Sequence, residues 1–152
     1  MSKLQRVLGA GIALALMNGP ATAAGEAGTI KVIKGSVSID RAGKRAPVTV
    51  GDRVMSADRV ITGADSAVGI TLRDNTRLTA GPDSVVSLDK YSFDSTTHAG
   101  ELDASVNKGT LSVVSGKLAA AAPDKVSFRT PTATLGVRGT DFVIEVAERG
   151  AD

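Results

Sequence analysis

The 152-residue chain contains no cysteine, no tryptophan and a single histidine. Without cysteine the protein can form no disulfide bond, and it cannot bind a metal through thiolate ligands. Activated nucleophiles in enzymes commonly depend on cysteine or on a neighbouring histidine, so a chain with one histidine has few ways to build one. The composition therefore disfavours an enzyme, and it predicts neither a metal nor any other cofactor.

The one histidine, His98, lies in the polar stretch 95–100, where a solvated loop residue is the simplest interpretation. Residue counts alone do not exclude a Ser-His-Asp triad, although the chain lacks the G-x-S-x-G elbow that marks many nucleophilic serines. Glycine-rich phosphate loops are absent as well. A hydrolase is thus a hypothesis without a motif to support it.

Several aspartates lie in short stretches that also contain Gly, Asn, Ser or Pro, where their side chains commonly organise turns. They include Asp52, Asp58, Asp65, Asp74 and Asp83. Such oxygen ligands could bind calcium, and paired carboxylates could hydrolyse a glycosidic bond. Because the spacing matches no EF-hand loop, we interpret these aspartates as turn residues and predict no metal site.

The N-terminal residues have the plan of a secretory signal peptide. Lys3 and Arg6 form a basic start, residues 7–17 are apolar, and residues 20–24 are mostly small. An apolar run of this length is too short for a bilayer span, which needs about 20 residues. The sequence predicts a signal peptide over 1–23, cleaved near Ala23, and a soluble periplasmic or secreted domain over 24–152.

Removing this segment also removes the excess of positive charge. The whole chain has 18 basic and 16 acidic residues, and without Lys3 and Arg6 the two counts are equal at 16. A nucleic-acid binder normally keeps a lasting basic surface. A nucleic-acid partner is therefore not expected.

The remaining sequence is typical of short strands separated by turns. Val68, Ile70 and Leu72 alternate with smaller or polar residues, as expected for a half-buried strand, and Asp74-Asn75 predicts a hairpin turn after them. Helix is expected only over 118–122. Residues 34–39 resemble 108–113 without a regular period, so the prediction is a single all-β domain of short twisted strands, arranged as a stacked β-roll, solenoid-like, or as a sandwich.

Residues 130–144 combine features that ordinary strands lack. Apolar alternation changes phase between Leu135 and Phe142, and Gly139 is the natural site of a bulge that shifts the register. Pro131 cannot donate to a ladder, so it is expected to begin a strand or to lie at an edge. Arg138 could brace this bend by pairing with Asp141 or Glu145, or it could bind an anionic partner.

This segment resembles the closing signature of FecR domains, in which a T-P-T-A element precedes V-R-G-T-x-F. The candidate motif and interaction residues are Thr130, Pro131, Thr132, Val137, Arg138, Gly139, Thr140 and Phe142. Further segments are similar to the family pattern in order along the chain, namely 35–37, 50–54, 60–67, 72–76 and 82–84. Asn75 stands where many members have glycine.

The resemblance implies an all-β domain that senses signals or binds proteins outside the cytoplasm, without catalysis. Only six residues precede the apolar run, so we expect no cytoplasmic sigma-regulating part. The leading hypothesis is a non-catalytic periplasmic interaction module that binds an unidentified envelope protein through a strand edge. The alternative is a carbohydrate or peptidoglycan binder, although only Tyr91 and Phe93 are clustered for stacking on a sugar.

Overall fold

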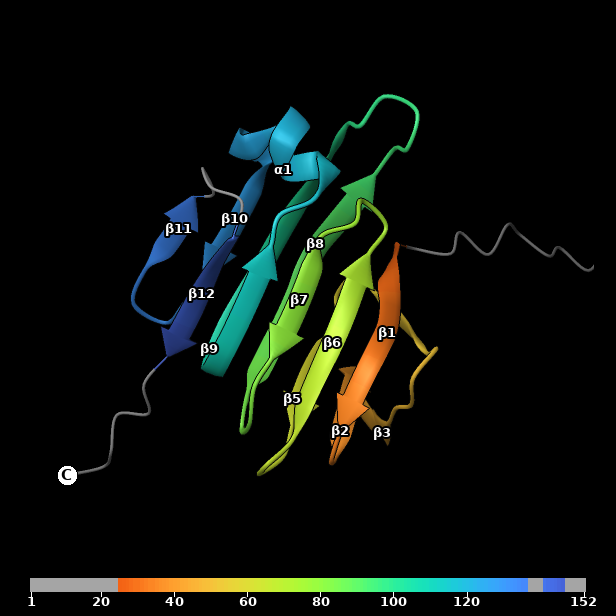
Figure 1. Ribbon diagram of the computed structural model, residues 1–152, viewed down its shortest axis with the longest axis vertical. Coiled ribbons are helices and arrows are strands. Elements are labelled where there is room, and N and C mark those ends of the chain that lie inside the picture. Colours follow the sequence, from red (N-terminus) through yellow and green to blue (C-terminus); the bar gives the residue numbers. More distant parts are fainter. Residues whose placement is uncertain (1–24, 137–140, 147–152) are drawn as a thin grey trace, which may run out of the picture.

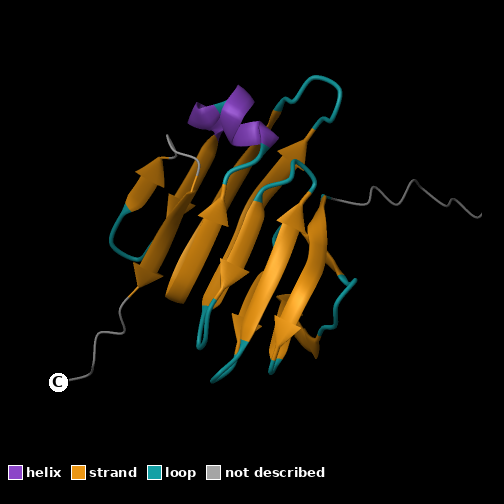
Figure 2. Ribbon diagram, viewed as in Figure 1, coloured by secondary structure: helices purple, strands orange, loops and turns teal. Residues whose placement is uncertain are grey.

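The computed structural model describes residues 25–136 and 141–146, and almost all of them belong to strands or the turns between strands (Figures 1 and 2). The elements in chain order are β1 (Glu26–Lys34), β2 (Val37–Arg41), β3 (Lys44–Pro47), β4 (Arg53–Met55), β5 (Arg59–Thr62), β6 (Ala67–Leu72), β7 (Arg77–Ala80), β8 (Val85–Phe93), β9 (Gly100–Val114), α1 (Lys117–Ala121), η1 (Pro123–Lys125), β10 (Val126–Arg129), β11 (Thr134–Gly136) and β12 (Asp141–Val146). The all-β prediction is confirmed, and the expected helix corresponds to α1. No helix in the described ranges is long and apolar enough to span a bilayer.

The strands form one curled sheet whose two halves pack around a common core. We call the half with order β4-β1-β6-β7-β9-β12 sheet A and the half with order β3-β2-β5-β8-β9-β10-β11 sheet B. Strand β9 belongs to both: its first part pairs with β8 and β10, and its last part pairs with β7 and β12. Among the described strands only β9 and β10 pair in parallel.

Alternation along the strands fills the core with aliphatic side chains. In β6, Val68, Ile70 and Leu72 are buried while the residues between them are partly exposed. The predicted hairpin follows at once, with Asn75 at a φ of 71° and the Leu72 N–H bonded to the Thr76 carbonyl oxygen at 2.8 Å. The strand and the turn predicted from this segment are thus confirmed.

Two of the places where the chain passes between the sheets share the sequence pattern G-x-D-S. Residues 63–66 (G-A-D-S) connect β5 to β6, and residues 81–84 (G-P-D-S) connect β7 to β8. In each, the aspartate takes a positive φ, 53° at Asp65 and 50° at Asp83. The serine that follows is buried in each case, at Ser66 and Ser84.

Two further crossings explain the resemblance between 34–39 and 108–113. Gly35, between β1 and β2, and Gly109, within β9, both have positive φ and lie against one of the buried serines. The N–H of Ser36 donates to Ser66 Oγ at 2.9 Å, and the N–H of Thr110 donates to Ser84 Oγ at 3.0 Å. The weak internal repeat therefore reflects two equivalent pairs of crossings rather than a regular solenoid.

The C-terminal segment departs from the sequence-based expectation. Phe142, Ile144 and Val146 point inward in β12, as predicted, but β11 and β12 lie in different sheets. The phase of alternation changes where the chain changes sheet, so no register shift within a single strand is needed to account for it. Pro131 lies in the turn before β11 rather than at the start of that strand. Gly139 is outside the described residues.

Candidate functional site

The signature segment lies at one end of the curled sheet, in β10, β11, β12 and the turn at 130–133; we call this region the signature end (Figure 1). The turn is closed by the Thr130 N–H, which donates to the Ala133 carbonyl oxygen at 2.8 Å. The Thr130 hydroxyl oxygen accepts from the N–H of Ala133 at 3.1 Å and of Thr132 at 3.4 Å. A side-chain-capped turn thus accounts for the threonine at position 130.

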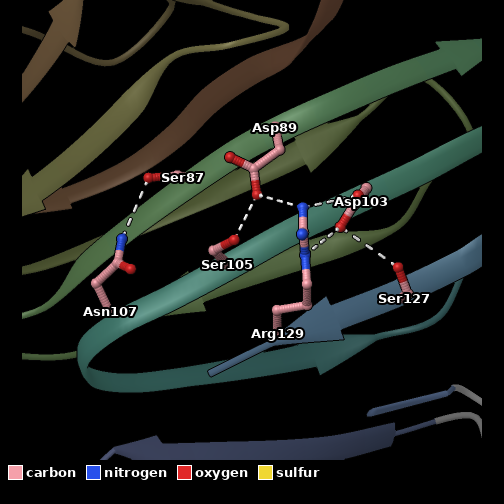
Figure 3. A network of polar contacts seen from close by, with 7 residues as sticks. All are labelled: Ser87, Asp89, Asp103, Ser105, Asn107, Ser127 and Arg129. Carbon is pink, nitrogen blue, oxygen red and sulfur yellow. Dashed lines mark hydrogen bonds and ion pairs between the residues drawn. The ribbon is translucent and has the colours of Figure 1, made fainter. Parts of the chain in front are cut away.

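Arg129, directly before this turn, ties β10 to the neighbouring strands on the outer face of sheet B (Figure 3). Its Nε and Nη2 donate to the two carboxylate oxygens of Asp103 on β9, at 3.1 and 2.9 Å. The same Nη2 lies 3.4 Å from Asp89 Oδ2 on β8. The guanidinium fork therefore spans three strands, a geometry that lysine could not reproduce.

Serine hydroxyls complete this polar cluster. The Ser105 hydroxyl donates to Asp89, and the Ser127 hydroxyl lies 3.4 Å from Asp103 Oδ1 (Figure 3). Both carboxylates are occupied by a cation and a hydroxyl. Because Asp89 is paired with Arg129, it is a poor base for activating Ser105, and no contact between Ser105 and a histidine is seen among the described residues. The cluster is suited to holding the β10–β11 hairpin in place rather than to catalysis.

Strand β12 forms the outer edge of sheet A at the signature end. Phe142 points inward and packs edge-to-face on Phe128, with ring centroids 5.3 Å apart. Asp141, Val143 and Glu145 point outward, and Val143 is 68% exposed. Of the described strands only β9 pairs with β12. An exposed valine between two acidic residues thus lies along an edge strand.

The predicted motif residues fall into three groups. Thr130, Pro131 and Thr132 are in the capped turn, and Phe142 is in the core side of β12. Val137, Arg138, Gly139 and Thr140 lie outside the described residues. Whether Arg138 braces a bend or contacts a partner stays a prediction. The sequence analysis did not identify the cluster of Arg129 with Asp89 and Asp103. The one signal for it in the sequence was that Arg129 directly precedes T-P-T-A.

The comparisons with known proteins agree with the signature. The family model described as FecR protein matches residues 58–152. The chain belongs to the FecR family. No curated protein matches the chain significantly. A solved structure titled "Cell surface anchoring domain" is similar at 30% identity, over 41% of this chain and 83% of its own, with a TM-score of 0.40.

Residues 25–57, which precede the match, pack in the same sheets as the matched segment. Strand β1 lies between β4 and β6 in sheet A, and β2 lies between β3 and β5 in sheet B. Ala27, Ile30, Val37 and Ile39, from these two strands, belong to the common core. The segments before and after residue 58 therefore share one core.

Two aspartates of this FecR domain are completely buried. Asp58 accepts both Nε and Nη2 of Arg41, at 2.8 and 2.7 Å, and also the Met55 N–H at 2.8 Å. The hydrogen bond with Asp58 raises the pKa of the Arg41 guanidinium above its ordinary value. A carboxylate so fully surrounded by donors has a structural role, here in holding the turn before β5.

Asp74 does the same at the hairpin between β6 and β7. Its carboxylate accepts the Tyr91 hydroxyl at 2.8 Å, the Thr76 hydroxyl at 2.7 Å and the Leu118 N–H at 3.0 Å. Burial, with the nearby Asp74 charge, raises the pKa of the Tyr91 hydroxyl. The predicted turn role of Asp74 is confirmed, and its links to β8 and α1 were not predicted.

The catalytic alternatives receive no geometric support in the described residues. His98 is in the loop between β8 and β9, where its ring stacks on Phe93 with centroids 5.8 Å apart. Among the residues that the structure describes, no group of three His, Asp or Glu side chains could hold a metal ion.

Proposed function

We propose that this FecR protein is a non-catalytic interaction or signal-sensing module of the cell envelope that binds another protein at the edge strand β12. The observation that carries the proposal is the exposed Val143 on a strand that pairs, within the described chain, on one side only. An edge of this kind can accept a strand from another protein. A membership of the regulatory FecR family is consistent with such a role.

The other edges of the sheet are less suitable for strand addition. Strand β3 carries Lys44, Arg45 and Pro47, and charge and proline both oppose pairing with a further strand. Strand β4 has only three residues. Near β12, by contrast, Val114 on β9 and Leu135 on β11 are each more than a third exposed. Strand β11, the remaining edge, is also only three residues long, so the contrast between the edges favours β12 as the site of interaction.

A carbohydrate or peptidoglycan partner has weaker support. Tyr91, Phe93 and Phe128 are buried, and Phe142 is partly buried against the core. These four are all the aromatic residues of the chain, so no ring is presented for stacking on a sugar. Sedimentation with purified cell wall tests this alternative, and recovery of the folded protein in the pellet would favour it over a protein partner.

Site-specific photocrosslinking tests the proposed interaction in cells that export the protein. A photoreactive phenylalanine at position 143 should give a discrete crosslinked species, whereas the same group at Val32 should not. Val32 is a matched control because it is 61% exposed and lies on β1, next to β4 at the opposite end of the strand order in sheet A. Equal crosslinking at both positions, or at neither, would refute binding at β12.

Export is tested separately. The mature protein isolated from the periplasm or medium is expected to begin near Ala24, as measured by its intact mass. A full-length mass in the cytoplasmic fraction would contradict the proposed localisation.

A further inference from the structure

The charges on β12 indicate which strands it can accept, an inference that rests on the proposed function and makes it more specific. Asp141, Val143 and Glu145 alternate with the inward-facing residues, so all three lie on the outer face of sheet A. Their partners in β9 are Val114, Ser112 and Thr110, none of which carries a charge. The edge therefore presents an acidic-apolar-acidic row.

Both carboxylates of this row lack a counter-ion within the described chain. All the ion pairs there involve Arg41, Arg53 or Arg129, which lie on other strands. Asp141 lies opposite Val114 on β9, and Val114 in turn lies opposite Arg77 on β7. Arg77 is the first basic residue in this direction across the sheet. An incoming strand would therefore meet two carboxylates, one on each side of Val143, that no described residue neutralises.

The rules for side-chain pairing between neighbouring strands predict which sequence could bind beside this row. Residues directly opposite on neighbouring strands share a face, and opposite charges there are favourable while like charges are unfavourable. We propose that β12 binds an extended segment of another protein that carries basic, apolar and basic residues at alternate positions. The apolar residue pairs with Val143, and the basic residues pair with Asp141 and Glu145. Because the pattern is symmetric, parallel and antiparallel partners both satisfy it.

The same row disfavours a second copy of this chain as the partner. Antiparallel pairing of two β12 strands centred on Val143 would bury both valines, but it would place Asp141 of each copy opposite Glu145 of the other. Two like-charge pairs at an otherwise favourable contact oppose self-association. The acidic residues of β12 thus select its partner in two ways, because they attract a basic strand and repel a second copy of β12.

Synthetic peptides test the specification directly. A short peptide with the core Lys-Thr-Val-Thr-Lys should bind the exported domain saturably and should shift the β12 amide resonances. A peptide with Glu in place of both Lys should have an affinity at least about tenfold lower. In the double variant Asp141→Lys with Glu145→Lys, this preference should be reversed. Because both substituted positions are exposed, circular dichroism melts should show that the fold is retained.

The outcomes separate the two proposals. Equal binding of both peptides, an unchanged preference in the double variant, or no saturable binding would overturn the charge specification. If photocrosslinking from position 143 still succeeds, the edge binds a partner of different chemistry and the proposed function stands. Self-association of the wild type that is lost in Val143→Lys would instead identify a second copy as the partner and would also overturn the specification.

Discussion

At the scale of single residues, the two buried carboxylates organise this FecR domain. Asp58 and Asp74 each follow a tight turn yet reach well beyond it, to Arg41 on β2 and to Tyr91 on β8. Sequence reasoning placed both in turns, because aspartate favours turns locally. It could not show their burial, since their partners lie 17 residues away in the chain.

The first prediction concerns Asp74. Asp74→Ala should lower the free energy of unfolding by about 3 kcal/mol, because the Tyr91 hydroxyl and the Leu118 N–H lose their acceptor inside the core. Urea denaturation measures the change. Asp124→Ala, at an exposed position in η1, is the control and should change stability by less than about 0.5 kcal/mol. A similar loss in the two variants would show that the buried network is not important for stability.

The second prediction concerns pH. The pKa of Tyr91 is raised in the folded protein, so the folded state keeps the proton that the unfolded state releases above about pH 10. The contribution of Tyr91 to stability is therefore complete at neutral pH and is lost as the pH rises above that value. Melting temperature measured from pH 8 to 11 should fall, and the fall should be shallower in Tyr91→Phe. Identical slopes would contradict this linkage.

At the scale of elements, the crossings between sheets are the most demanding positions. A Cβ at Gly109 would overlap the Ser84 side chain and backbone, whereas a Cβ at Gly43 would meet open space, although both glycines have a positive φ. Gly109→Ala should therefore cost about 2 kcal/mol more than Gly43→Ala, the difference being the overlap rather than the backbone strain. Chemical denaturation of the two variants measures this difference in the free energy of unfolding. Equal losses of stability would contradict the packing argument.

The Arg129 cluster makes a prediction for the β10–β11 hairpin. Arg129→Ala should lower overall stability by only about 1 kcal/mol, because the ion pairs are half exposed. Hydrogen exchange in β11 should nevertheless become clearly faster, since the fork links this outer hairpin to β8 and β9. Arg129→Lys should not restore protection. Unchanged exchange in β11 would show that strand pairing alone holds the hairpin.

The sequence predicted individual strands better than it predicted their assignment to sheets. Alternation in 67–72 and 142–146 gave the correct inward faces, because the side-chain period of a strand is local. That residues 130–144 contribute to two strands in different sheets was not predicted, because which sheet a strand joins depends on partners far away in the chain. The residues of the Arg129 cluster were missed for the same reason: they come from three strands.

At the scale of the whole molecule, every described strand except β3 and β11 contributes to one core. Residues 25–57 supply β1 and β2, which pair with β6 and β5. A fragment containing only 58–152 should therefore fail to fold, because it would expose the edges of β5 and β6 and leave the core incomplete. A protein beginning at residue 25 should fold with one cooperative transition. Dispersed amide resonances from the fragment 58–152 would contradict this expectation.

The paired crossings also limit how such a domain can change in length during evolution. G-A-D-S takes the chain from sheet B to sheet A, and G-P-D-S takes it back. A duplication of one crossing would leave every later strand in the wrong sheet, with its apolar residues facing water. A duplication of two crossings would keep the order intact. Insertions and deletions among related domains should therefore occur as whole pairs of strands.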